Sequence, residues 1–210
     1  MLPLITLDIR ISRSTPDGGV YNYYNRYDYD VKLLTDNQEI FIGRGSSVLY
    51  LGEKAKNEEF DLFDAFDENK HEEIYNLLYD EEGDLQDEWE DIFINNDSFN
   101  ILVSDRLEIL PGYQHHGYGK IVRYILRDFF YGCYAIEILH SFPLQLEAFD
   151  NNEPWRAQMH YDTMEHDASK AHVSLNHYYL RTGYTQYQDT EYFYRFPSNE
   201  LLDESEWEDK

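Results

Sequence analysis

A strand, a glycine-containing loop and a helix follow one another directly, and this unit constrains the fold of the chain more than any other stretch. From Asn100 to Leu110 the sequence contains the apolar run ILVSDRLEIL, which predicts a strand that stops at Pro111 and Gly112. The loop beyond it opens a helix that ends near Gly132. One broad apolar stripe runs along this helix and consists of Ile121, Val122, Ile125, Leu126, Phe129 and Phe130.

The N-terminal quarter has the pattern of β structure. Leu4 to Arg13 alternates apolar and polar side chains, which predicts a half-buried strand. Tyr21 to Asp30 has no helical period and predicts a strand or an ordered loop. Two β-rich runs, Glu39 to Ile42 and Ser47 to Leu51, flank glycines that can adopt the positive φ angles of a hairpin, so we expect neighbouring strands there.

A strongly acidic segment, at about residues 54–91, separates these strands from the strand, loop and helix unit. Apolar residues recur in it near helical spacing, which predicts one or two amphipathic helices. We favour helices packed on the sheet with their acidic side in water, and the alternative is a lid or a partner-binding face. The remaining predicted elements are a strand at Tyr134 to Leu139, a helix at Ala168 to Arg181, a strand at Tyr192 to Phe196 and an acidic tail at residues 198–210.

The composition predicts a folded domain and narrows the class of partner. The chain has 210 residues, 42% of them hydrophobic, and a formal charge of −25 from 42 acidic and 17 basic residues. This charge repels nucleic acid and anionic membrane surfaces and favours a cationic partner, although solubility alone also explains it. No apolar run approaches the roughly 20 residues that span a bilayer. Cys133 is the only cysteine, so no intramolecular disulfide forms, and we expect a cytoplasmic protein.

The loop from Gln114 to Lys120 has the features of an anion-binding site. Its two glycines let the backbone approach a ligand, and the helix that begins there has unpaired N–H groups that can bind phosphate oxygens. Lys120 could add a positive charge, and an ordinary tight turn is the alternative. His115 and His116 do not predict a metal site, because adjacent loop residues rarely both reach one ion and no Cys or His at helical spacing completes a ligand set.

This loop resembles a motif of the GNAT superfamily of acyl-CoA N-acyltransferases. Gln114-x-x-Gly117-x-Gly119 is similar to the family's [RQ]-x-x-G-x-[GA] pyrophosphate loop. Ile109-x-Pro111 lies where the family has its V-x-P strand end. The same order of strand, loop and helix surrounds the motif in the family.

A second stretch resembles the same family. Tyr179 to Tyr184, YLRTGY, is similar to the family's Y-x-x-x-G-[FY] helix end, and a terminal strand pair is expected after it. The resemblance covers about residues 100–196. The family's frequent asparagine and its small residue fall here on His172 and Leu175, and the Tyr-rich stretch at Tyr21 to Asp30 stands where the family has a helical pair. The acceptor site is normally built in that N-terminal part, so the acceptor is not carried over from the family.

The resemblance implies one α/β domain over residues 1–197, with a mixed, mostly antiparallel central sheet flanked by helices. The sheet is expected to split so that acetyl-CoA, as co-substrate, enters between two diverging strands. The backbone amide of Ile109 would meet the acyl carbonyl. The residues implied to hold acetyl-CoA are Ile109, Gln114, His115, His116, Gly117, Tyr118, Gly119 and Lys120.

The family mechanism implies direct attack of an acceptor amine on the thioester. Tyr179 would be the acid that protonates the leaving thiolate, with Tyr178 as the alternative. A strand carboxylate would be the base, and period-two geometry places Asp105 rather than Glu108 on the face that leads to Ile109. Alternatively, Asp105 forms an ion pair with Arg106 or another cation and takes no part in catalysis. A base that acts through a water molecule would leave no sequence signal.

Together these features predict an N-acetyltransferase that moves an acetyl group from acetyl-CoA to a primary amine. The net charge favours a cationic acceptor, such as a polyamine, an aminoglycoside or a lysine-bearing protein. No metal is expected. The alternative from another class is a catalytically inactive GNAT-like binding module whose acidic helices and tail engage a basic protein.

Overall fold

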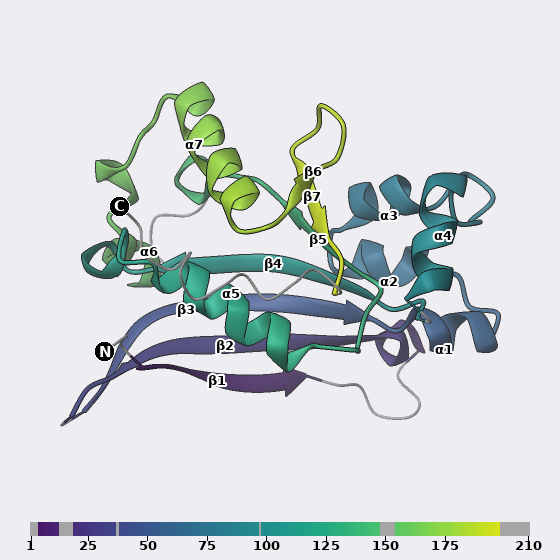
Figure 1. Ribbon diagram of the computed structural model, residues 1–210, viewed down its shortest axis with the longest axis horizontal. Coiled ribbons are helices and arrows are strands. Elements are labelled where there is room, and N and C mark those ends of the chain that lie inside the picture. The colour runs from purple at the N-terminus through teal and green to yellow at the C-terminus, as the bar shows by residue number, and fades with distance from the viewer. Residues whose placement is uncertain (1–3, 13–18, 37, 97, 148–153, 198–210) are drawn as a thin grey trace.

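The computed structural model describes residues 4–12, 19–36, 38–96, 98–147 and 154–197. Within them, seven strands form one sheet in the order β1-β2-β3-β4-β5-β7-β6 (Figure 1). Every neighbouring pair is antiparallel except β4 and β5, so the expected α/β fold with a mostly antiparallel sheet is confirmed. The strands are β1 (Leu4–Ser12), β2 (Tyr24–Leu34), β3 (Glu39–Tyr50), β4 (Ile101–Ile109), β5 (Ile136–His140), β6 (Thr185–Gln186) and β7 (Tyr192–Arg195).

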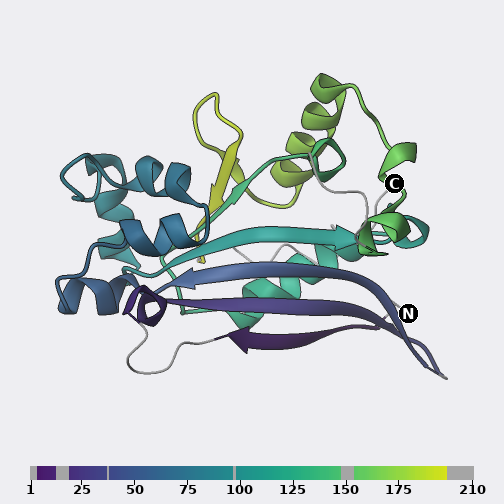
Figure 2. The ribbon, with the colours of Figure 1, turned by 180° about the vertical axis from the view of Figure 1, so that it is seen from behind.

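Helices cover both faces of this sheet. Figures 1 and 2 show α5 lying along one face of β1 to β4, while α1 to α4 gather at one end of the sheet. None of the described helices is long and apolar enough to cross a membrane. The helices are α1 (Gly52–Asn57), α2 (Phe63–Glu68), α3 (Glu72–Leu78), α4 (Asp87–Asn95), α5 (Tyr118–Phe129), α6 (Pro154–Met159) and α7 (Ala168–Arg181), and short 3-10 turns lie at Gly19–Tyr23, Pro111–Tyr113, Leu144–Leu146 and Tyr161–Thr163.

The acidic segment packs on the sheet as expected, but it forms four short helices, α1 to α4, rather than one or two. Phe66 of α2 is fully buried and stacks on Tyr50 of β3 with 3.7 Å between ring centroids. The additional helix ends arise because Glu59 and Lys70, after α1 and α2, adopt left-handed backbone angles with φ of 52° and 60°. Neither residue type is a recognisable helix breaker, so the sequence pattern does not reveal these ends.

The predicted hairpin around Gly43 and Gly45 is wrong, because β3 is one continuous strand through both glycines. Neither glycine has a positive φ angle. A Cβ atom on Gly45 would lie 2.4 Å from the ring of Tyr29 and 2.5 Å from the carbonyl oxygen of Arg106. The glycines therefore let neighbouring groups approach the strand closely. The Tyr-rich stretch supplies Tyr29; its first residues lie in the 3-10 turn Gly19–Tyr23 and the rest belongs to β2.

The central feature of the sheet is the parting of β4 from β5. The two strands pair only from Ile101 to Val103 on β4 and from Ile136 to Ile138 on β5. Beyond these positions β4 continues to Ile109 while β5 turns away from it (Figure 1). The expected split between two diverging strands is thus present in the sheet.

The packing predicts a test on one short helix. Phe66→Ala should lower the free energy of unfolding by about 3–5 kcal/mol, because it leaves a cavity between α2 and the sheet. The control is Phe63→Ala on the same helix, whose side chain is 39% exposed and which should cost much less. Urea unfolding of both variants measures the difference, and equal losses would contradict this view of the core.

Candidate functional site

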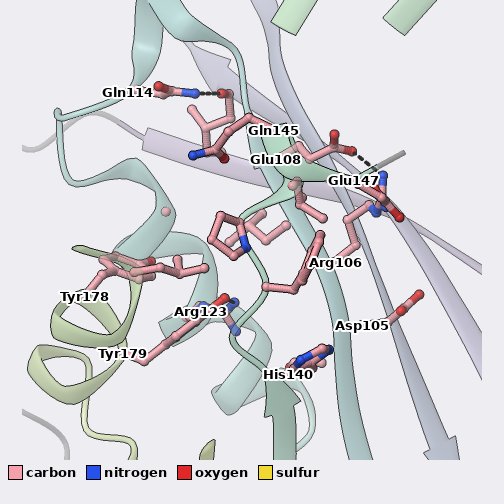
Figure 3. Close-up of a pocket in the computed structure, with 18 of the residues that line it drawn as sticks. Asp105, Arg106, Glu108, Gln114, Arg123, His140, Gln145, Glu147, Tyr178 and Tyr179 are labelled. Carbon is pink, nitrogen blue, oxygen red and sulfur yellow. Dashed lines mark hydrogen bonds and ion pairs between the residues drawn. The ribbon is translucent and has the colours of Figure 1, made fainter. Parts of the chain in front are cut away.

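A cavity of about 1110 Å³ lies where β4 and β5 part (Figure 3). Its walls come from β4 from Val103 onward, the loop and first turns of α5, one side of α7 from Ala171 to Arg181, the chain between α2 and α3, and the segments at residues 142–147 and 159–165. Typical small-molecule sites have volumes of roughly 300–1,000 Å³. The cavity therefore has room for a large ligand.

The N-terminus of α5 forms one wall of this cavity. Gly117 precedes the helix with φ of 77°, a left-handed conformation that favours glycine. The first N–H groups of a helix, here from Tyr118 onward, have no intrahelical acceptor. A Cβ atom on Gly119 would lie 3.1 Å from the hydroxyl oxygen of Tyr178, so the second glycine lets α7 approach α5 closely.

The end of β4 presents backbone groups to the same cavity. The N–H of Leu110 donates to the carbonyl of Ile42 on β3 at 2.8 Å. Successive N–H groups of a strand point to opposite edges, so the N–H of Ile109 points toward the side where β5 has left. The side-chain amide of Gln114 donates to the carbonyl oxygen of Ile109 at 2.8 Å and fastens the loop to the strand.

Most residues that the sequence selected lie around this cavity. Asp105 and Tyr179 line it, and so does every residue implied to hold acetyl-CoA except His116. His116 is exposed and lies beside Tyr118, with 5.8 Å between ring centroids. The structure therefore brings the two family-like motifs together although they are far apart in the sequence.

Charge is distributed unevenly around the cavity. The lining contains six Lys or Arg and five Asp or Glu residues, whereas the whole chain has 17 and 42. The described lining residues from α5 and α7 include Lys120, Arg123 and Arg181 but no carboxylate. The lining acids come from β4 and from the segments that face it, and they are Glu68, Asp105, Glu108, Glu147 and Glu165. The lining from α5 and α7 thus favours an anion, whereas the rest of the lining combines the five acids with three cations, Arg26, Lys70 and Arg106.

Tyr178 and Tyr179 lie at the C-terminal end of α7 and surround the guanidinium of Arg123 (Figure 3). Arg123 is 5% exposed and donates to the hydroxyls of Tyr184 at 3.1 Å and Tyr179 at 3.5 Å. Burial raises the pKa of Tyr178, and the charge of Arg123 opposes that rise. Burial would lower the pKa of Arg123, but the surrounding phenols and Glu137 raise it well above its ordinary value.

A buried ionic network lies beneath these tyrosines. Glu137 of β5 accepts from Arg195 Nε at 2.5 Å, from Ser104 Oγ at 2.5 Å and from Tyr184 Oη at 2.6 Å. Burial would raise the pKa of Glu137, but Arg195 and the two hydroxyl donors lower it, so the carboxylate is ionised. The network joins β4, β5, β7 and the short segment between α7 and β6 that carries Tyr184.

The predicted face of Asp105 is wrong. A bulge between Val103 and Arg106 shifts the register against β3, and it reverses the alternation of side chains along β4. Ile109 therefore packs with the core beneath α5, whereas Asp105 approaches His71 of the chain between α2 and α3. Strict period two misses this because a bulge changes the parity of every later residue.

Asp105 has three partners at this position. Its carboxylate accepts from Ser46 Oγ at 2.7 Å and from Arg26 at 3.2 Å, and it lies 3.5 Å from His71 Nε2. Burial would raise the pKa of Asp105, but His71, Ser46 and Arg26 together lower it to about 2. A carboxylate with so low a pKa is a weak proton acceptor, and it can attract a cation instead.

Glu108, the residue that the sequence ranked second, is buried and committed to other groups. It accepts from the Tyr161 hydroxyl and from Arg44 Nε at 3.1 Å. Arg106 lies 3.7 Å from the same carboxylate. These contacts fasten the chain around Tyr161–Thr163 to the outer end of β4.

Sequence reasoning missed Arg123 and Glu137, although both carried a signal. Arg123 lies four residues after Gly119 and three before Leu126, so helical spacing puts it on the buried side of an amphipathic helix. Glu137 interrupts the apolar strand AIEIL. A charge at a core position predicts a buried pair, but the partners, Arg195 and Tyr184, are far along the chain.

Comparison with protein-family models, curated proteins and solved structures found no match to this chain. Within the described part of the chain, no group of three or more His, Cys, Asp or Glu side chains could hold a metal ion.

The contacts of Asp105 predict a pH-dependent contribution to stability. Its pKa falls from 3.8 to about 2 on folding, so its ionised form stabilises the fold above about pH 4, and this stabilisation is lost as the pH falls toward 2. Asp105→Asn should therefore destabilise the protein more at pH 6 than at pH 3. Urea unfolding at both values measures this, and an equal or larger loss at pH 3 would contradict the assignment.

Proposed function

We propose that the protein is a GNAT-type N-acetyltransferase that moves an acetyl group from acetyl-CoA to a primary amine of a cationic acceptor. One observation carries the proposal. The glycine-opened N-terminus of α5 and the tyrosine-bearing end of α7, which contain the two family-like motifs, line one cavity at the point where two parallel strands part.

The wall formed by α5 and α7 suits the pyrophosphate of acetyl-CoA. Backbone N–H groups from Tyr118 onward and the positive end of the helix would bind its oxygens. Gly117 leaves open space beside them, because a Cβ atom there would meet nothing within 4 Å. Lys120 and Arg181 add positive charge to the same wall.

The outer part of β4 and the end of α7 suit the thioester. The N–H of Ile109 would polarise the acyl carbonyl by donating a hydrogen bond to it. Tyr179 would give a proton to the departing sulfur as the acid. The main contribution of the protein is to hold amine and thioester in line, an effect that can supply several kcal/mol.

The acidic wall suits the acceptor. Asp105 stays ionised at neutral pH and would hold a cationic group of the acceptor near the thioester. Glu68 and Glu165 also line the cavity outside α5 and α7, whereas Glu108 and Glu147 are paired with Arg44 and Arg106. The low pKa of Asp105 favours release of the amine proton to water rather than to this carboxylate. Turnover of acetyl-CoA over a panel of amines, ordered by charge, tests the acceptor class.

Gly117→Glu should abolish binding of acetyl-CoA without unfolding the protein, because it places bulk and negative charge against the pyrophosphate. Calorimetry measures the loss. The matched control is Gly132→Glu beyond the other end of α5, where φ is 73° and the space beside the Cα is equally open. Both variants carry the same backbone strain and charge, but only Gly117 lines the cavity.

Binding of acetyl-CoA to the wild-type protein distinguishes the acetyltransferase from the alternative, an inactive acidic binding module. At a hundredfold excess over its Kd, acetyl-CoA should stabilise the fold by about 2.7 kcal/mol, which a thermal shift detects. No shift, or equal affinity in Gly117→Glu and Gly132→Glu, would refute the proposed site. Absence of any shift would favour the acidic binding module, whose helices α1 to α4 expose many carboxylates.

Once an acceptor is found, Tyr179→Phe should lower kcat about 10²-fold or more while the affinity for acetyl-CoA hardly changes. The substitution keeps the buried ring and removes only the hydroxyl. If the hydroxyl only bound substrate, its loss would raise KM and leave kcat unchanged. Tyr178→Phe is the matched control on the same helix. Full activity of Tyr179→Phe with loss in Tyr178→Phe would move the acid to Tyr178.

A further inference from the structure

The buried network beneath the cavity has one positive charge in excess. Arg195 and Glu137 form a close pair, with 3% and 2% of their side chains exposed. Arg123 is equally buried, but its hydrogen bonds go to phenol oxygens, and its Nε has no hydrogen-bond partner. Two guanidiniums thus share one carboxylate. An uncompensated buried charge is costly, and Arg123 borders the cavity, where an anion could compensate it.

The hydrogen bonds of Arg123 also fix the direction in which the hydroxyls of Tyr184 and Tyr179 donate their protons. A phenol has one O–H to donate. Tyr184 accepts from Arg123 and donates its proton to Glu137. Tyr179 accepts from Arg123 in the same way, but no hydrogen bond among the described residues takes its proton. Since a guanidinium only donates, it turns the Tyr179 proton away from itself.

We propose that Arg123 is a positioning residue that directs the Tyr179 proton at the sulfur of CoA and stabilises the phenolate left behind. The inference rests on the proposed function. When the carbon–sulfur bond breaks, its electron pair stays on sulfur and Tyr179 gives its proton to it. The phenolate beside Arg123 regains a proton from solvent as the new amide nitrogen releases one.

Other charged and titratable groups around Arg123 do not remove this effect. Glu137 is already paired with Arg195. Burial raises the pKa of Tyr178, so it stays protonated as a thiol ionises. Arg123 is charged throughout the accessible pH range. The groups that interact with Arg123 are Tyr29 of β2, Glu137 of β5, Tyr178 and Tyr179 of α7, and Tyr184, with Arg195 of β7 bound to Glu137.

The test uses free CoA and desulfo-CoA, which differ only at the sulfur and need no acceptor. An ordinary thiol titrates near pH 8.5. If binding lowers the pKa of the CoA thiol by about one unit, the affinity for CoA relative to desulfo-CoA should rise about sevenfold between pH 7 and pH 9.5. Calorimetry measures both ligands at both pH values. Desulfo-CoA reports every titration that does not involve sulfur.

Arg123→Met should reduce this gain to less than twofold, and any loss of desulfo-CoA affinity should be the same at both pH values. Arg123→Lys, which keeps the charge, should restore part of the gain. The folding control is Arg195→Met. It leaves Glu137 without its cation and should lower Tm, whereas Arg123→Met removes the excess charge and should keep or raise Tm.

The outcomes separate this inference from the proposed function. If neither ligand binds, the proposed function fails and the inference fails with it. If both bind and the wild type shows no relative gain at pH 9.5, the function stands and the inference is overturned. A gain that persists in Arg123→Met, or a loss of Tm in Arg123→Met equal to that in Arg195→Met, also overturns it.

Discussion

The carboxylate of Glu137 joins three strands at the place where the backbone ladder between β4 and β5 ends, because it pairs with Arg195 of β7 and accepts from Ser104 of β4. Glu137 pairs with Leu102, and this is the middle one of the three positions that join β4 to β5. Its carboxylate also binds Ser104 of β4, just beyond the last paired residue. Arg195 helps to keep this carboxylate ionised, and the hydrogen bond from Ser104 links β4 to β5 where their backbone pairing stops. The cavity depends on this junction, since its two walls part directly above it.

The net charge of the chain gives a poor guide to the charge of this cavity. More than a third of the Lys and Arg residues line it, since six of the 17 are there, while only five of the 42 acids are. The acids gather elsewhere, because residues 52–95 alone contain 17 acidic and 3 basic residues. An anionic ligand therefore meets a locally balanced surface within a strongly acidic protein.

The abundance of tyrosine and of carboxylates has a shared structural role at the acidic end of the molecule. Tyrosine hydroxyls from the N-terminal 3-10 turn and from the β6–β7 hairpin donate to carboxylates on or beside α1 to α4. Tyr23 donates to Glu58 at 2.8 Å, and Tyr187 donates to Glu88 at 2.5 Å. A phenol can bury its ring and still donate to an exposed carboxylate. These bonds fasten short helices that lack side-chain N-caps.

The sequence by itself determined the elements with strong local signals. The helix at Ala168–Arg181, the strand before Pro111 and the glycine loop all lie where periodicity and turn residues placed them. Tertiary structure alone decided the rest. The bulge in β4 puts Asp105 on the face opposite Ile109. The close approach of the Tyr29 ring leaves no space for a Cβ atom at Gly45, which explains a glycine inside a strand. The physical reason is the separation in sequence between the residues that interact. Periodicity within one segment indicates which side of an element is buried, but bulges and ion pairs depend on a partner strand that is distant in sequence.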